Sequence, residues 1–221
     1  MKLLIHALAK FLLGLAAVAL LLFLPAGSLL YINGWLFIGV LFIPMILLGA
    51  ILLIKAPHLL EERLNSKEKE STQKGVVALS GLLFLGGFIA AGLDFRFGWS
   101  QMPLWLEIAF SGVLLVSYAL YGEVMRENAY LSRTVKVQEG QKVIDTGLYG
   151  IVRHPMYAVT IPLFLSIPLV LGSWVSLLFF LHYPLIIVLR IRNEEKVLAE
   201  GLDGYREYMK KVRYRLIPFI W

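Results

Sequence analysis

The sequence predicts an all-α integral membrane protein with about six transmembrane helices. Of its 221 residues 59% are apolar, and the mean hydropathy is +0.76, whereas soluble domains contain about 45–50% apolar residues. Several apolar runs reach the length of about 20 residues that a helix needs to cross a hydrocarbon layer of about 30 Å. In addition, every Lys and Arg except Arg96 lies in segments that this arrangement places on one side. The lengths of the apolar runs, the composition and the charge distribution therefore all predict a membrane protein with several spans.

Four apolar runs, 3–24, 29–54, 75–93 and 104–122, predict the first four helices. The "LPAGS" stretch at 24–28 resembles a secretory cleavage site, but the apolar core and flanks of the first run fit a retained span. The run 155–189 is long enough for two short spans and has Gly172-Ser173-Trp174 at its middle. We therefore expect a helical hairpin there, and treat 1–221 as a single membrane domain with N-terminal spans in 1–122.

The basic residues predict the orientation of the chain. They lie near the N-terminus, in the loop 55–74, in the segment 123–153 and in the tail from Arg190. By the positive-inside rule, both termini and these loops lie in the cytoplasm. The loop 56–74 is expected to form a short surface helix. The net charge of +6 is therefore a topology signal and does not indicate a nucleic-acid partner. Cysteine is absent, which excludes thiolate metal sites and cysteine nucleophiles, and no metal is predicted.

The stretch "TGLYGIVRHPMYAVTIPL", residues 146–163, concentrates polar side chains where a membrane helix begins. His154 precedes Pro155, so we predict that His154 caps a helix whose first turn contains the proline. A helix N-terminus favours anionic groups. Tyr157 then lies one turn inside the helix. The alternative is that Arg153 and His154 are simple interfacial residues.

A second polar cluster, "LRIRNEEKVL" at 189–198, follows the last apolar run. Arg190 and Glu194 are four residues apart on one helix face, which fits a structural ion pair. Near a membrane such charges are costly and usually functional. Before them, His182 is a functional candidate unless it bonds a carbonyl group that Pro184 frees, and Pro184 should kink the helix.

Two further segments complete the polar face. In 131–144, the alternation at 135–138 and the Glu139-Gly140 turn predict an extended flap over the helices. Gly201 and Gly204 should end the preceding helix, with a basic helix restarting at 205–212. The chain has no G-x-G-x-x-G, Walker loop or H-E-x-x-H motif, so a soluble-type nucleotide domain and a zincin are not expected.

Together, "QKVIDTGLYGIVRHPMY", the hairpin, "RIRNEEKVL" and "YREYMKKVRYRLIP" resemble the isoprenylcysteine carboxyl methyltransferase family and its relatives, the membrane phospholipid methyltransferases. The resemblance covers roughly 130–221, and R-H-P-x-Y also occurs in membrane sterol reductases. It implies that 123–221 is a catalytic region in which a loop and the C-terminal tail close a cytoplasmic pocket over S-adenosylmethionine.

The resemblance also implies roles for individual residues. Arg190 and Glu194 are the implied catalytic residues, and Arg190 is implied to address the substrate. Tyr183 lies seven residues before Arg190 on nearly the same helix face, so it is a further candidate for substrate binding. The position of Gln141 is commonly histidine in the family, so a backbone contact is expected there. The implied cofactor-binding residues are Gln138, Gln141, Lys142, Val143, Ile144, Tyr149, His154, Pro155, Met156, Tyr157 and Glu194.

The predicted function is transfer of a methyl group from S-adenosylmethionine to a lipophilic acceptor, which is a small molecule, a lipid or a lipidated substrate in contact with membrane lipids. Arg190 favours a carboxylate acceptor. Three alternatives stay open. A phospholipid-type N-methyltransferase would need a base, Glu195 or His182. An NADPH-dependent, sterol-reductase-like enzyme would use Tyr183 as proton donor and the tail arginines for phosphates, but the acidic Glu194-Glu195 pair disfavours it. The third is a non-enzymatic lipid-binding or assembly subunit.

Overall fold

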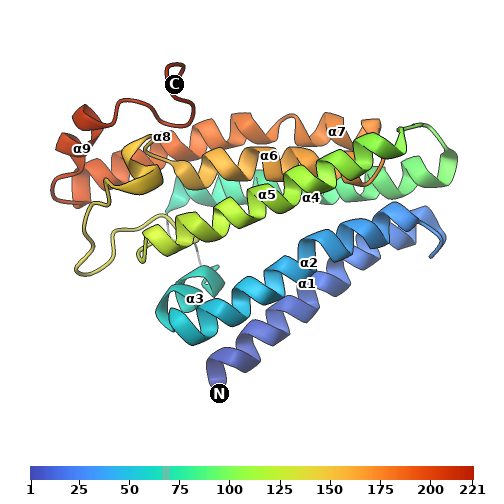
Figure 1. Ribbon diagram of the computed structural model, residues 1–221, viewed down its shortest axis with the longest axis horizontal. Coiled ribbons are helices and arrows are strands. Elements are labelled where there is room, and N and C mark those ends of the chain that lie inside the picture. The colour runs from blue at the N-terminus through green and yellow to red at the C-terminus, as the bar shows by residue number, and fades with distance from the viewer. Residues whose placement is uncertain (67, 69) are drawn as a thin grey trace.

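The computed structural model describes residues 1–66, 68 and 70–221, and these form helices, turns and loops without a β-strand. The long helices lie side by side in an elongated bundle (Figure 1). The predicted surface helix of the loop 56–74 is α3, Pro57–Leu64. Lys67 and Lys69 of the same loop lie outside the described residues.

The four long helices predicted from the apolar runs are present. They are α1, Lys2–Ala26, α2, Ile32–Lys55, α4, Ser71–Phe97, and α5, Leu104–Glu127. A short 3₁₀ turn, η1, Gly147–Gly150, precedes the C-terminal helices. These are α6, Pro155–Val170, α7, Trp174–Phe180, α8, Tyr183–Gly201, and α9, Tyr205–Lys211.

Within the described residues, five segments are long and apolar enough to cross a membrane: α1, α2, α4, α5 and the stretch Trp174–Gly201, which contains α7 and α8. The sixth predicted span, α6, has only 16 residues, about 24 Å of helix at 1.5 Å per residue. The hairpin itself is present. Gly172, at φ 73°, turns the chain, and the Ser173 hydroxyl caps α7 by accepting the N–H of Ser176 at 2.9 Å.

Helix α4 packs closely against α1 and α7, because two of its glycines let these neighbours approach. A Cβ at Gly92 would lie 2.4 Å from the carbonyl oxygen of Leu22 in α1. A Cβ at Gly87 would lie 2.5 Å from the ring of Phe180 in α7. Close backbone approach at small residues is the usual way in which membrane helices pack. Phe180 also packs edge to face against Phe84 of α4.

Large apolar side chains cover the outside of the bundle. A soluble protein would not expose so many of them, whereas a lipid-facing surface needs them. Strongly exposed examples on different helices are Leu13, Leu24, Ile54, Leu82, Val116, Leu178 and Leu185.

Both termini, α3, η1 and α9 lie toward one end of the bundle, and the turns that join α1 to α2, α4 to α5 and α6 to α7 lie toward the other (Figure 1). The polar segments 128–154 and 202–221 therefore meet at the same end, as the charge distribution predicts. Membrane sidedness follows from the positive-inside rule and stays a prediction.

Candidate functional site

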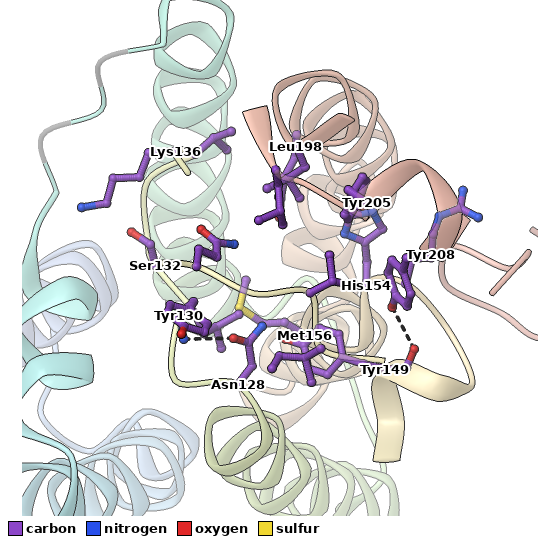
Figure 2. Close-up of a pocket in the computed structure, with 18 of the residues that line it drawn as sticks. Asn128, Tyr130, Ser132, Lys136, Tyr149, His154, Met156, Leu198, Tyr205 and Tyr208 are labelled. Atoms are coloured by element: carbon purple, nitrogen blue, oxygen red, sulfur yellow. Dashed lines mark hydrogen bonds between the residues drawn. The ribbon is translucent and has the colours of Figure 1, made fainter. Parts of the chain in front are cut away.

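A pocket lies where α8, α9, η1, the start of α6 and the loop 128–146 meet (Figure 2). Its empty space is about 800 Å³, including the part open to solvent, but the centre of a water molecule can occupy only about 90 Å³ of it. The pocket is therefore narrow, and its walls have to separate for a larger ligand to enter.

The start of α6 forms the floor of the pocket as predicted. His154 is the N-cap of α6, and Pro155 follows in the first turn. The backbone N–H groups of Arg153 and His154 donate to the carbonyl oxygens of Tyr214 and Arg215, both at 2.9 Å. This short ladder fixes the C-terminal tail against the residues before α6. The His154 side chain, which is buried, faces the pocket.

A buried carboxylate ties these segments together. Glu195 of α8 accepts from Arg153 Nε at 2.7 Å and from Arg215 Nε at 2.8 Å. Its Oε1 also lies 3.2 Å from His154 Nε2. Arg153 donates in addition to the carbonyl oxygens of Val212 and Arg213, both at 2.8 Å. Arg153 is thus a structural anchor rather than a simple interfacial residue, and Glu195 is already engaged by three side chains.

Arg190 and Glu194 face the pocket from one side of α8. Within the described chain the two side chains form no direct ion pair, because the Tyr157 hydroxyl of α6 lies between them. This hydroxyl accepts from Arg190 Nε at 2.8 Å and donates to Glu194 Oε2 at 2.5 Å. Arg190 also donates to the carbonyl oxygen of Arg133 at 2.7 Å. The predicted ion pair is therefore a chain of two charge-assisted hydrogen bonds through a phenol.

The loop 128–146 covers the pocket and is held by two ion pairs, one near its middle and one near its C-terminal end. Lys136 Nζ lies 2.6 Å from Glu62 of α3, and Lys211 Nζ of α9 lies 2.6 Å from Asp145. The predicted turn at Glu139-Gly140 is present, with the Gln141 N–H donating to the Gln138 carbonyl at 3.1 Å. The loop therefore occupies the position that a flap over the pocket requires.

The structure brings most of the predicted site residues to this pocket. Those that line it are Gln141, Lys142, Val143, Ile144, Tyr149, His154, Met156, Tyr157, Arg190 and Glu194. Pro155 acts through the helix start that it forms. Gln138 is not among the lining residues, and its side-chain amide donates to the Tyr130 carbonyl at 2.5 Å. Contact of these residues with a cofactor stays a prediction.

Two other candidates lie outside the pocket. Tyr183 is buried among aromatic rings, 4.7 Å from the ring of Phe164, and its hydroxyl donates to Thr160 Oγ1 at 3.2 Å. Its predicted substrate contact is therefore not supported by its position. His182 lies at the break between α7 and α8, where its Nδ1 is 2.9 Å from the carbonyl oxygen of Leu178. This is the kind of satisfied histidine that a proline-induced break predicts.

Sequence reasoning missed several residues of the pocket wall. Tyr205 and Tyr208 of α9, with Leu198 and Leu202 at the end of α8, line the pocket. The Tyr208 hydroxyl donates to the Tyr149 carbonyl at 2.8 Å (Figure 2). Burial raises the pKa of both α9 phenols, so they stay protonated. The sequence did hold a signal for two of them. Residues four apart share a helix face, so Leu198 and Leu202 could have been predicted to face the same pocket as Arg190 and Glu194.

The model of the isoprenylcysteine carboxyl methyltransferase family matches residues 106–200, from α5 almost to the end of α8. The match confirms the resemblance predicted from the motifs, and it supports a membrane methyltransferase-like domain in this part of the chain.

Parts of this chain are also similar to two sterol reductases and to an uncharacterized protein. A Delta(14)-sterol reductase of Mus musculus is 30% identical over 91 residues, which are 40% of this chain and 22% of that protein. A Delta(14)-sterol reductase of Methylotuvimicrobium alcaliphilum is 23% identical over 136 residues, 55% of this chain and 32% of that protein. The uncharacterized protein YpbQ of Bacillus subtilis is 34% identical over 97 residues, 43% of this chain and 57% of that protein. The matched parts thus cover between about a fifth and about three fifths of these relatives.

Proposed function

We propose that this chain, whose residues 106–200 match the isoprenylcysteine carboxyl methyltransferase family, transfers a methyl group from S-adenosylmethionine to a lipophilic acceptor that carries a carboxylate. The observation that carries the proposal is the hydrogen-bonded chain Arg190–Tyr157–Glu194 in a narrow pocket at the end of apolar helices. It presents an anion-binding guanidinium beside a cation-binding carboxylate.

The pocket residues fit the chemical groups of the cofactor. S-adenosylmethionine carries an ammonium, a carboxylate, a sulfonium and a purine nucleoside. Glu194 offers a negative charge to the cationic groups. Lys142 and the start of α6 offer partners for the carboxylate. Tyr149 and Tyr157 present aromatic rings, which favour contact with cations.

When bound, S-adenosylmethionine supplies an electrophilic methyl group, whose bond to sulfur breaks as the acceptor oxygen attacks and whose bonding electrons stay on sulfur. The protein orients the acceptor and excludes water. Arg190 holds the acceptor carboxylate by paired hydrogen bonds. The Tyr157 hydroxyl fixes the position of the guanidinium through its hydrogen bond to Arg190 Nε.

The contacts of the two candidate bases, Glu195 and His182, also favour methylation of a carboxylate over methylation of an amine. An amine acceptor would need a base to take its proton. Glu195 is held by Arg153 and Arg215, and the Nδ1 of His182 faces the carbonyl of Leu178 away from the pocket. A carboxylate is already anionic at neutral pH and needs neither of them, so the proposal disfavours N-methylation.

The acceptor would approach from the membrane. An apolar groove lies between α4 and the α7–α8 segment, and its lining runs from Leu79 and Leu178 to Leu189, the residue before Arg190. A hydrocarbon chain in this groove would bring an attached carboxylate toward the guanidinium. We place this end of the bundle in the cytoplasm, where the cofactor is dissolved, because the basic residues gather there.

A reductase is the second candidate, because two of the similar proteins are Delta(14)-sterol reductases. It would need a proton donor at the substrate and basic residues for the cofactor diphosphate. Tyr183, the candidate donor, is buried in the core and bonded to Thr160. Glu194 beside the pocket would repel a diphosphate. Both features favour the methyltransferase.

The test is calorimetric titration of the detergent-purified chain with S-adenosylhomocysteine and, separately, with NADPH. We expect micromolar binding of S-adenosylhomocysteine, strongly weakened in Glu194→Gln and unchanged in the control Glu200→Gln, an exposed glutamate on the same helix. Transfer of labelled methyl to long-chain acids then tests the acceptor. Binding of NADPH alone would refute the proposal.

A further inference from the structure

The hydroxyl of Tyr205 is a buried polar group that lacks a partner. The residue is only 4% exposed and lines the pocket. Among the described residues its oxygen has no hydrogen-bond partner, unlike the neighbouring Tyr208, whose hydroxyl bonds the Tyr149 carbonyl. An unsatisfied buried hydroxyl is costly, and most buried polar groups do find partners. The position of this hydroxyl in a ligand pocket therefore points to a partner on the ligand.

The pocket has two chemically different ends along α8. Four lining positions, Arg190, Glu194, Leu198 and Leu202, follow each other at intervals of four residues. At 1.5 Å per residue, Leu198 lies about 12 Å along the helix axis from Arg190. The first two side chains are charged and the last two are apolar. The charged end suits the sulfonium and the acceptor, and the apolar end suits an uncharged, flat group.

Tyr205 belongs to the apolar end. It packs with Leu202 and Tyr208, and Val143 and Leu198 contact the same cluster. The rings of Tyr205 and Tyr208 lie 5.6 Å apart between centroids. Figure 2 shows Leu198, Tyr205 and Tyr208 on the wall opposite Ser132 and Lys136 of the covering loop. The phenol stays protonated, since burial and the negative charges of Glu194 and Glu195 raise its pKa. It is therefore available as a donor.

We propose that Val143, Leu198, Leu202, Tyr205 and Tyr208 form the site for the purine base of the cofactor, and that the Tyr205 hydroxyl donates a hydrogen bond to a ring nitrogen of that base. The inference rests on the proposed function, and it gives roles to Leu198, Leu202, Tyr205 and Tyr208, to which the resemblance assigns none. A purine is flat, uncharged and rich in acceptor nitrogens, which matches apolar and aromatic walls with one unpaired donor. It also puts the reacting end of the cofactor toward Arg190.

The test compares binding of two probes, S-adenosylhomocysteine and 5′-methylthioadenosine, to the wild-type chain, to Tyr205→Phe and to the control Tyr214→Phe. Tyr214 lies outside the pocket wall. The second probe carries the nucleoside without the amino acid. Loss of one neutral hydrogen bond should raise the Kd of Tyr205→Phe about 3- to 12-fold for both probes alike. The Kd values of Tyr214→Phe should match the wild type.

A second measurement separates a ligand contact from a structural one. Because Tyr205→Phe removes a hydroxyl that no described protein group pairs with, the ligand-free variant should melt at the same temperature as the wild type or higher. A clearly lower melting temperature would show that the hydroxyl is paired inside the protein and would overturn the inference.

Three outcomes of the binding measurements would refute the inference. Equal affinity of wild type and Tyr205→Phe for both probes would refute the purine site and leave the methyltransferase proposal intact. Weaker S-adenosylhomocysteine binding with unchanged methylthioadenosine binding would move the hydroxyl to the amino-acid end of the cofactor and refute the assignment. A wild-type chain that binds neither probe would remove the proposed function, and the inference with it.

Discussion

Replacing Glu195 by glutamine should destabilise the fold more than any exposed charge substitution. The side chain of Glu195 is 6% exposed and accepts from Arg153 and Arg215 at 2.7 and 2.8 Å. Glutamine keeps the volume but carries no charge, and its amide nitrogen would face a guanidinium. Arg153, whose side chain is 5% exposed, then loses its counter-ion.

The decrease in the free energy of unfolding can be estimated from the contacts of Arg153 and Arg215. Breaking a buried ion pair on one side costs about 3–5 kcal/mol. Arg153 retains two carbonyl acceptors, and the side chain of Arg215 is 32% exposed, so water can solvate it. We therefore expect a loss near the lower limit, about 3 kcal/mol. For a chain of this size that lowers Tm by about 6–12 °C, at about 2–4 °C per kcal/mol.

The assay is tryptophan-fluorescence melting in detergent micelles, with Glu200→Gln as the control for loss of an exposed carboxylate. Limited trypsin digestion gives a second readout, because release of the tail should speed cleavage after Arg213 and Arg215. A Tm within 2 °C of the wild type together with a protected tail would refute the claim that Glu195 holds the tail in place.

Three further predictions concern the pocket and its cover. Gly147→Ala should lower both Tm and ligand affinity, because Gly147 has φ 54° and a Cβ would lie 2.1 Å from Glu127 Oε1; melting and titration measure both, and a wild-type Tm would contradict it. Tyr157→Phe should reduce methyl transfer about tenfold or more through loss of charge-assisted hydrogen bonds, with the folded structure retained by circular dichroism. The Lys211 hydrogen bond lowers the pKa of Asp145, so Asp145→Asn should be slightly less stable than the wild type at pH 7. That difference should shrink as the pH falls below 3.8, the ordinary pKa of the carboxyl group, and vanish below the lowered pKa of the folded state, where Asp145 takes up its proton; an equal difference at pH 3 and pH 7 would contradict it.

The long helices could be predicted because apolar length alone specifies a membrane span. The four runs 3–24, 29–54, 75–93 and 104–122 correspond to α1, α2, α4 and α5. Helices α1, α4 and α5 extend beyond their runs, whereas α2 starts three residues later than its run and ends one residue after it. Apolar length predicted the number of spans less well than it predicted these four helices. Pro155 and Gly172 confine α6 to 16 residues, and length and composition qualify only five segments of the described chain.

The site was predictable where neighbours in sequence share a helix face, and not where distant segments meet. Arg190 and Glu194 were recognised from their spacing of four. That a phenol from α6 would bridge them depends on the rotation of one helix against another, which periodicity does not specify. The Glu195 contacts depend on the path of the tail, because Arg215 reaches the carboxylate only when the segment 212–216 runs beside Arg153. The spacing of Tyr183 from Arg190 likewise does not reveal that its side chain turns into the aromatic core, and its contact with a substrate stays a prediction.

The single hydroxyl between Arg190 and Glu194 would make the proposed cofactor and acceptor sites thermodynamically dependent on each other. A cation that engages Glu194 would compete with the Tyr157 hydroxyl for the carboxylate, and this would change how strongly the same phenolic oxygen holds the guanidinium of Arg190. Linkage requires the effect to be reciprocal, so an anion bound to Arg190 changes the affinity of the cation site by the same factor. Cofactor and acceptor would then bind with coupled affinities, and the coupling would pass through one phenolic hydroxyl.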